Sequence, residues 1–536
     1  MSVLRFINVL RVFLAVALTV AVSGIPASAS PAHWTPDASR ITAVTVASTQ
    51  PLGTFNGADY VRLVGTVQGV VGPDEHVVGL DAVPKDAAGN YPYSAQFELI
   101  TAADGEPRSD AVVVEAENRG SPLVFDAAQN LGLLIGPPST IVYPAGLGNG
   151  FLQNAGLSWA RVQWQGPNAA TVVNPTVPAT AQGVGEVIMR DFGLLLRGFG
   201  TATGLPSFDT ALLVGVSQSA WFVNTFVAEG FNEPPSGRGH PKPRRVFDGA
   251  YAQDGVGNWL ALNQINAEEG FTSQTPYVQK DGVPISPRKL LRRPLSDPFF
   301  VDTTAYTDYY RVRASLFNDH RLLPANLREY NVPNAHASAA SLPPNTAPSR
   351  VNCAVGAAPV PALNPLDGRP YTRALILGLA RRVGVHGLRV DAPHLPLSNQ
   401  FDLTDGPSAP GTDANGVPLF NFLPGVDLKV PVVNSDGQPS GGLARYPDLS
   451  LPLGVPSPVA IPPVGTNSIL DICGNFGGWR PFSSSELAAR YGSVSAYVTA
   501  YDELLDPLVE RGRVLEADRA GILAFVTTLY NAAPTT

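Results

Sequence analysis

Cysteine is scarce in this sequence, which limits both its covalent cross-links and its metal chemistry. Cys353 and Cys473 are the only two cysteines, so at most one disulfide can join the chain to itself. The seven histidines are scattered, and neither an H-E-x-x-H sequence nor paired C-x-x-C sequences occur, which are spacings that hold zinc. We therefore expect no metal and no cofactor.

Charged side chains are also few, at 15% of the residues, and the formal net charge is −8. No local run of Lys and Arg forms the basic stripe that nucleic acid binding requires. Beyond residue 30, no apolar run is long enough to span a bilayer. The composition therefore argues against a nucleic acid partner and against a membrane span in the mature chain.

The first thirty residues have the character of a targeting segment. Arg5 and Arg11 precede an apolar run from Val12 to Val22, and Ala27-Ser28-Ala29 offers a cleavage site of the A-x-A type. We predict a signal peptide at 1–29 and a secreted or periplasmic mature protein; the alternative is an uncleaved anchor. In an oxidising compartment, a disulfide between Cys353 and Cys473 is expected, and two buried thiols are the alternative.

The remaining chain divides by composition and pattern. Residues 40–115 read as short β segments broken by turn residues, and 116–385 alternate strands with helices, which favours an α/β sheet. Residues 386–480 are rich in Pro and Gly and irregular, whereas 481–536 are helical from a capping box at Ser483-Ser484-Ser485-Glu486. The patterns predict strands at Ala111–Ala116, Trp159–Trp164, Ala211–Val214, Arg245–Phe247, Pro298–Val301 and Leu327–Val332, and helices at Gly185–Arg197 and Tyr371–Val383.

A nucleophile elbow is predicted where the strand Ala211–Val214 runs into Gly215-Val216-Ser217-Gln218-Ser219 and then into a helix through Val227. A sharp turn between strand and helix exposes a serine hydroxyl to a base. Ser219 stands where a second glycine is usual. The sequence therefore predicts an α/β-hydrolase fold with Ser217 as its nucleophile; the alternative is a turn serine that caps the helix.

In this fold the acid and then the histidine follow the nucleophile along the chain. His336 comes shortly after the strand Leu327–Val332 and is preferred as the base over His320, whose alternative role is that of a solvated loop residue. Asp302, Asp308 and Asp248 all follow predicted strands, and spacing does not choose the acid among them.

The oxyanion of an ester transition state needs two backbone N–H donors in this fold. The residue after the nucleophile, Gln218, supplies one, and the loop Asn118-Arg119-Gly120 after an early central strand supplies the other, through Gly120. Arg119 either binds an anionic substrate group or pairs with a carboxylate.

The sequence resembles the large bacterial alpha/beta hydrolase domain proteins from about residue 45 to the C-terminus. The resemblance is carried by Glu117-Asn118-Arg119-Gly120, Trp164-Gln165-Gly166, Gly215-Val216-Ser217-Gln218-Ser219, Arg245-Val246-Phe247-Asp248-Gly249, Asn364-Pro365-Leu366-Asp367 and Leu487-Ala488-Ala489-Arg490-Tyr491-Gly492. It implies the fold and a hydrolytic reaction, but no substrate.

The same resemblance implies that the nucleophile is Ser217, that the histidine is His336, and that the acid is Asp308. The family's Thr-Glu-Tyr-Trp stretch resembles Thr307-Asp308-Tyr309-Tyr310, so a shorter acid stands at 308. The histidine loop, Asn334-Ala335-His336-Ala337, also departs from the family, which has Gln before and Gly after the histidine.

We therefore expect a secreted serine hydrolase that cleaves a small-molecule carboxylic ester. The alternatives are an acyltransferase with the same triad and a non-catalytic secreted binding protein on a hydrolase scaffold. Trp221, Tyr309 and Tyr310 are consistent with an apolar acyl or aromatic substrate group, although aromatics at such positions more often belong to the core.

Overall fold

The computed structural model describes residues 39–535, except 76, 78, 82, 105–107, 132–145, 165–182, 200–201, 203, 236–242, 261–283, 319–321, 337–362, 410, 413–418, 443–444 and 459–474. The predicted signal peptide at 1–29, both Cys353 and Cys473, and His320 lie outside the described residues. The signal peptide and the disulfide therefore stay predictions.

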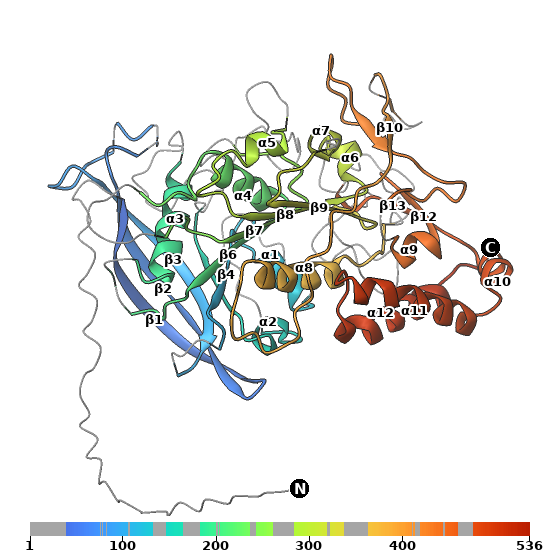
Figure 1. The fold of residues 1–536 in the computed structure, drawn as a ribbon, viewed down its shortest axis with the longest axis horizontal. Helices are drawn as coiled ribbons and strands as arrows, with labels where there is room; N and C mark the ends of the chain where they lie inside the picture. Colours follow the sequence, from blue (N-terminus) through green and yellow to red (C-terminus); the bar gives the residue numbers. More distant parts are fainter. Residues whose placement is uncertain are drawn as a thin grey trace, which may run out of the picture.

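Nine strands form one sheet, in the order β1-β2-β3-β5-β4-β6-β7-β8-β9 (Figure 1). From β1 to β5 in that order neighbouring strands are antiparallel, and from β5 to β9 they are parallel. The mostly parallel α/β sheet is thus confirmed, and the β-rich N-terminal segment extends it. The strands are β1 (Arg40–Phe55), β2 (Ala58–Val71), β3 (Tyr91–Ala102), β4 (Ala111–Glu115), β5 (Ser158–Val162), β6 (Thr210–Val216), β7 (Gly249–Gln253), β8 (Phe299–Ala305) and β9 (Leu327–Val332).

Helices cover both faces of the parallel part of the sheet. On one face, α3 (Val184–Leu196) and α4 (Gln218–Ala228) pack in one hydrophobic cluster, and on the other, α1 (Leu123–Ala128) and α8 (Arg369–Arg382) pack in a second (Figure 1). A strand covered on both faces is apolar at successive positions, and every residue of β4, β5, β6 and β8 is buried. The predicted helices at Gly185–Arg197 and Tyr371–Val383 are confirmed to within two residues.

The predicted strand at Arg245–Phe247 is wrong, because β7 begins only at Gly249. Val246 and Phe247 are buried against α3, where a Cβ on Gly193 would lie 2.6 Å from Val246 Cγ1. Arg197 Nη1 donates to the carbonyl oxygens of Arg245 and Val246, each at 3.0 Å. Val246 and Phe247 are therefore apolar because they pack against α3. The Arg197 guanidinium bonds backbone carbonyl oxygens that would bond to a neighbouring strand if this segment were in the sheet.

The Pro- and Gly-rich segment carries two small antiparallel sheets in otherwise irregular chain. β10 (Leu403–Asp405) pairs with β11 (Lys429–Pro431), and β12 (Gly454–Ser457) pairs with β13 (Gly478–Pro481). The short helix α9 (Pro447–Ser450) lies between the two pairs in the sequence. Strands of three or four residues have too little pattern to be predicted from the sequence.

Helices dominate the C-terminal segment, where they pack beside α9 and the α8 face (Figure 1). The predicted capping box is present: Ser483 Oγ accepts from Glu486 N at 3.2 Å, and Glu486 Oε2 accepts from Ser483 N at 2.7 Å. No described helix combines the length and apolar character needed to cross a bilayer. The remaining helices are α2 (Phe151–Asn154), α5 (Pro287–Leu290), α6 (Asp308–Arg311), α7 (Ser315–Asn318), α10 (Ser484–Tyr491), α11 (Val494–Glu510), the 3₁₀ helix η3 (Glu516–Asp518) and α12 (Arg519–Asn531).

Candidate active site

Ser217 occupies the single residue between the end of β6 and the start of α4. Its backbone has φ 55° and ψ −121°, a conformation that residues other than glycine rarely adopt. The turn is so tight that a Cβ on Gly215 would lie 2.4 Å from the Ser219 carbonyl oxygen, so glycine is required there. The sequence therefore folds into the strained strand-to-helix turn that projects a side chain from the sheet edge.

Ser219 has a bonding role in this turn that glycine does not offer. Its hydroxyl accepts from Val216 N at 2.9 Å and donates to Val216 O at 2.9 Å, and the residue is fully buried. Both backbone polar groups at the last position of β6 are thereby satisfied. Serine in place of the usual second glycine thus adds two hydrogen bonds that stabilise the turn.

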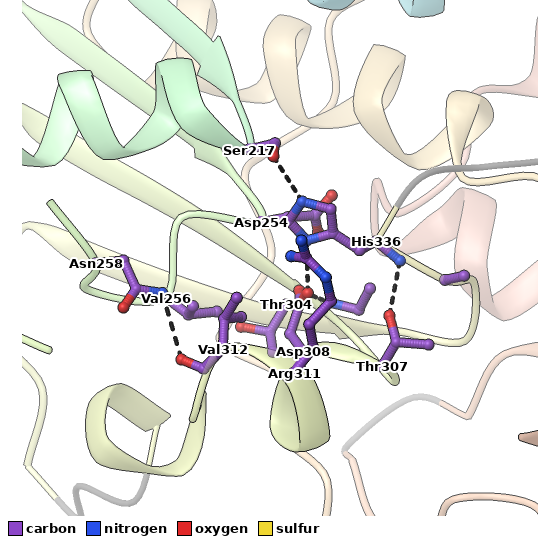
Figure 2. A network of polar contacts seen from close by, with 12 residues as sticks. Ser217, Asp254, Val256, Asn258, Thr304, Thr307, Asp308, Arg311, Val312 and His336 are labelled. Atoms are coloured by element: carbon purple, nitrogen blue, oxygen red, sulfur yellow. Dashed lines mark hydrogen bonds and ion pairs between the residues drawn. The ribbon is translucent and has the colours of Figure 1, made fainter. Parts of the chain in front are cut away.

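Three side chains from separate strand ends form a continuous chain of hydrogen bonds (Figure 2). Ser217 Oγ lies 2.7 Å from His336 Nε2, and His336 Nδ1 lies 2.6 Å from Asp308 Oδ1. Asp308 is fully buried and His336 is 3% exposed. The imidazole is thus held between a hydroxyl and a carboxylate, which is the arrangement that activates a serine nucleophile.

Backbone contacts fix the acid and the base of this arrangement. Ala305 N donates to Asp308 Oδ2 at 2.8 Å, so the carboxylate is tied to the last residue of β8. His336 N donates to Thr307 Oγ1 at 2.9 Å, which joins the histidine loop to the start of α6 (Figure 2). The side chains are therefore oriented by the strand ends that carry them.

The structure does not bring the other two acid candidates to the imidazole. Asp302 lies inside β8, where Oδ2 accepts from Val256 N at 3.1 Å. Burial, followed by the charges of Glu329 and Asp308, raises the pKa of Asp302 well above its ordinary value. Asp248 precedes β7 instead of following a strand, so it lies at the opposite sheet edge, 3.3 Å from Arg197 Nη1.

The loop predicted to supply an oxyanion donor is anchored beside the elbow. Asn118 Nδ2 donates to Val216 O at 2.9 Å, and Arg161 Nη1 donates to Gly120 O at 2.9 Å. Gly120 has φ 84°, which suits glycine. Gln218 begins α4, and the first N–H groups of a helix have no partner within it. The structure thus places the loop of Gly120 and the N–H of Gln218 next to the same strand end.

Comparison with known proteins places the chain in a family. Residues 156–524 match the model of the family described as "Alpha/beta hydrolase domain". The chain belongs to the alpha/beta hydrolase domain family. None of the curated proteins matches this hydrolase-family chain.

Several solved structures share a distant similarity with this alpha/beta hydrolase. One is a glucuronoyl esterase from Solibacter usitatus, with 9% identity, coverage of 52% of this chain and 70% of that chain, and a TM-score of 0.27. Carboxyl esterase 2 from Tuber melanosporum has 12% identity, coverage of 43% and 66%, and a TM-score of 0.21. An arylesterase has 11% identity, coverage of 47% and 79%, and a TM-score of 0.24. Likeness at this level carries no argument about substrate.

Sequence reasoning missed one ionisable residue beside this site, Asp254, which belongs to the network in Figure 2. The residue directly follows β7, and the sequence pattern does not reveal this because it predicts a strand at Arg245–Phe247 and none at Gly249–Gln253. Tyr309, an aromatic residue that the sequence places near the proposed site, is fully buried and donates to Asn331 Oδ1 at 2.8 Å, so it belongs to the core.

Among the described residues, no three His, Cys, Asp or Glu side chains lie close enough together to bind a metal ion.

Proposed function

We propose that the protein is a serine hydrolase that cleaves carboxylic esters through an acyl-enzyme on Ser217. The observation that carries the proposal is the chain of contacts from Ser217 Oγ to His336 Nε2, at 2.7 Å, and from His336 Nδ1 to Asp308 Oδ1, at 2.6 Å. In this reading the imidazole takes the hydroxyl proton as Ser217 Oγ attacks the ester carbonyl carbon. Asp308 holds Nδ1–H and stabilises the imidazolium that forms.

The remaining steps use the same groups. The N–H groups of Gln218 and Gly120 are proposed to bind the oxyanion of the tetrahedral intermediate. The imidazolium then gives its proton to the leaving alkoxide, which departs as an alcohol and leaves the acyl group on Ser217. Water attacks this second ester while His336 takes its proton, and collapse of the intermediate releases the carboxylic acid and restores the serine hydroxyl.

Replacement of the nucleophile tests the proposal directly. Ser217→Ala should lower the rate of p-nitrophenol release from a short-chain p-nitrophenyl ester by about 10⁴-fold or more, because the covalent route is lost. Ser485→Ala removes an exposed hydroxyl on α10 and is the matched control, with wild-type activity expected. Undiminished turnover by Ser217→Ala would refute the assignment. Product analysis with and without an added alcohol distinguishes hydrolysis from acyl transfer.

We also propose that the protein acts outside the cytoplasm, on the strength of the residues at 1–29. The support is the order of Arg5 and Arg11, the apolar run Val12–Val22, and Ala27-Ser28-Ala29. N-terminal sequencing of the protein from the producing cells should give a chain that begins near Ser30. A chain that retains its first residues would contradict the proposal.

A further inference from the structure

The Pro- and Gly-rich segment contacts the helix that carries Asp308. Asn421 lies in this segment, 110 residues after Arg311 along the chain, and is 8% exposed. Its Nδ2 donates to Arg311 O at 2.8 Å, and its backbone N–H donates to Tyr310 O at 2.7 Å. Both acceptors belong to the last residues of α6, and the last carbonyl groups of a helix have no partner within it. Asn421 therefore satisfies the carbonyl end of the helix that begins at Asp308.

Arg313 completes the contact between these two stretches of chain. Its Nε donates to Asn421 O at 3.2 Å, and its Nη2 donates to Asn421 Oδ1 at 3.1 Å. Arg313 is 7% exposed and has φ 61°, an uncommon angle for a residue other than glycine. The backbone N–H, the backbone carbonyl and both side-chain polar atoms of Asn421 are thus bonded to residues 310–313. Four bonds to one short stretch give Asn421 a single defined position against α6.

The other end of α6 is tied to the triad. Asp308 Oδ2 accepts from Ala305 N at 2.8 Å, and Thr307 Oγ1 accepts from His336 N at 2.9 Å (Figure 2). α6 has four residues, and Val312 N donates to Asp308 O at 2.9 Å, so a displacement of the carbonyl end is passed to Asp308. Asp308 Oδ1 lies 2.6 Å from His336 Nδ1, and a catalytic group tolerates little displacement.

Neighbouring contacts hold the same segment along the residues after α6. Lys429 N donates to Ser315 Oγ at 3.0 Å, and Gln400 Nε2 donates to Asn318 O at 3.0 Å. Both acceptors lie on α7. Loss of the Asn421 side chain should therefore leave the segment docked, while Arg311 O at the end of α6 loses its donor.

We propose that Asn421 is a positioning residue of the hydrolase site: by holding the carbonyl end of α6, it keeps the Asp308 carboxylate on His336 Nδ1. The inference rests on the proposed function and gives the Pro- and Gly-rich segment a part in catalysis. Asn421 acts through Asp308 and not on the reacting atoms. Its loss should therefore slow the chemical step and leave binding of the ester unchanged.

Steady-state kinetics with the p-nitrophenyl ester test this division. Asn421→Ala should lower kcat by about 10-fold with little change in KM, because the contact of Asp308 with the imidazole counts most when the imidazolium forms. If Asn421→Ala does not fold, as judged by thermal melting, Asn421→Asp replaces it. The aspartate keeps the size and the acceptor for Arg313 but lacks the donor to Arg311 O, so the same loss of kcat is expected.

Asn232 is a matched control, because it is a buried asparagine with similar bonds far from the triad. It is 2% exposed, its Nδ2 donates to Phe247 O at 3.0 Å and to Ser296 O at 2.7 Å, and its Oδ1 accepts from Phe247 N at 2.8 Å. These partners precede β7 and β8, at the sheet edge opposite to the triad. Asn232→Ala should lower the midpoint of urea unfolding at least as much as Asn421→Ala, but it should keep the kcat of the wild type.

A double-mutant cycle separates positioning of Asp308 from every other effect. Its readout is the rate at which a fluorophosphonate labels Ser217, since stoichiometric labelling remains measurable in slow variants. Asp308→Asn should lower this rate by about 10⁴-fold. Asn421→Ala should lower it by about 10-fold in the wild type but by less than about 2-fold in Asp308→Asn, because the contact that Asn421 maintains is already lost.

Three results would overturn the positioning role of Asn421. The first is wild-type kcat in folded Asn421→Ala, and the second is a rise in KM alone. The third is an equal loss in both backgrounds, which would mean that Asn421 acts through another group on α6, such as the buried Arg311. Wild-type activity together with an inactive Ser217→Ala shows that each failure concerns Asn421 alone. A wild type that neither cleaves the ester nor reacts with a fluorophosphonate would instead remove the proposed function.

Discussion

Glu186 is a residue whose burial makes stability depend on pH. It lies in the first turn of α3, is fully buried, and its carboxyl group has no hydrogen bond to any other described residue. Burial, with a smaller contribution from Glu229, raises its pKa from 4.5 to about 8. The folded chain therefore keeps this proton in a pH range where the unfolded chain has lost it.

The sign of the effect follows from proton linkage. Between pH 4.5 and about 8 the folded state binds one more proton at this group, so the free energy of unfolding falls as pH rises. The contribution of Glu186 is about 1.4 kcal/mol per pH unit across that window. Glu186→Gln should remove this slope, so the variant should match the wild type at pH 5 and exceed it at pH 8 in denaturant unfolding. The exposed Glu503→Gln is the control, and equal slopes for wild type and Glu186→Gln would contradict the prediction.

At the scale of single residues, the sequence predicts the three side chains that meet at the sheet edge, but not how their neighbours bond. Ser217 follows from a strand, a turn and a helix, and His336 from its place after the last strand of the sheet. Spacing does not choose among the three candidate acids, and only the resemblance favours Asp308. The hydroxyl of Ser219 bonds to the backbone of Val216, and Asp254 has φ 57°; both are features of single positions, which no periodic pattern encodes.

At the scale of elements, the loop after β4 and the elbow after β6 are joined by one side chain. Asn118 Nδ2 donates to Val216 O at 2.9 Å, and Asn118 is 6% exposed. Asn118→Ala should lower kcat by about 10-fold or more with little change in KM, because a loosened loop weakens a contact made in the transition state.

A matched control separates this effect from a general loss of stability. Asn326 Nδ2 donates to Pro298 O at 2.9 Å, also from an asparagine to a backbone carbonyl, but at the sheet edge where β8 and β9 begin. Each variant should lose about 1 kcal/mol of unfolding free energy in urea. Only Asn118→Ala should lose kcat, and similar kinetics for both variants would speak against an anchoring role.

The sequence predicts the elements where a strand is buried on both faces of the sheet, or where apolar residues repeat with helical spacing over several turns. Leu327–Val332 is β9 to the residue, and α3 and α8 end close to their predicted limits. The sequence does not predict β7, because Gly249–Gln253 contains small residues and no β-branched run, while the apolar pair just before it resembles a strand. A local sequence pattern does not show whether an apolar residue is buried against a helix or belongs to a strand of the sheet.

At the scale of the whole molecule, a buried ionic network ties the antiparallel strands to the site. Arg161 on β5 donates to Glu98 Oε2 on β3 at 2.9 Å and to Gly120 O at 2.9 Å, and it lies 3.4 Å from Glu117 Oε2. Arg62 on β2 completes the network, 2.8 Å from Glu98 Oε1. One guanidinium thus links the N-terminal part of the sheet to the proposed oxyanion loop.

Removal of that guanidinium should affect both stability and catalysis. Arg161→Met leaves Glu98 and Glu117 buried without this cation, which should lower the free energy of unfolding by about 3–5 kcal/mol. Arg490→Met is the control: its ion pair with Asp436 is at the surface, and its loss should cost at most about 1 kcal/mol. Loss of the donor to Gly120 O should also lower kcat in Arg161→Met.

The loss of stability should itself depend on pH. Burial already raises the pKa of Glu117 to about 7, although the charge of Arg161 lowers it. Without Arg161, the folded chain holds the Glu117 proton to higher pH, while the unfolded chain has released it. The difference in unfolding free energy between wild type and Arg161→Met should therefore be larger at pH 8 than at pH 6, as measured by urea unfolding. A difference that stays constant across this range would show that the guanidinium acts through packing and not through its charge.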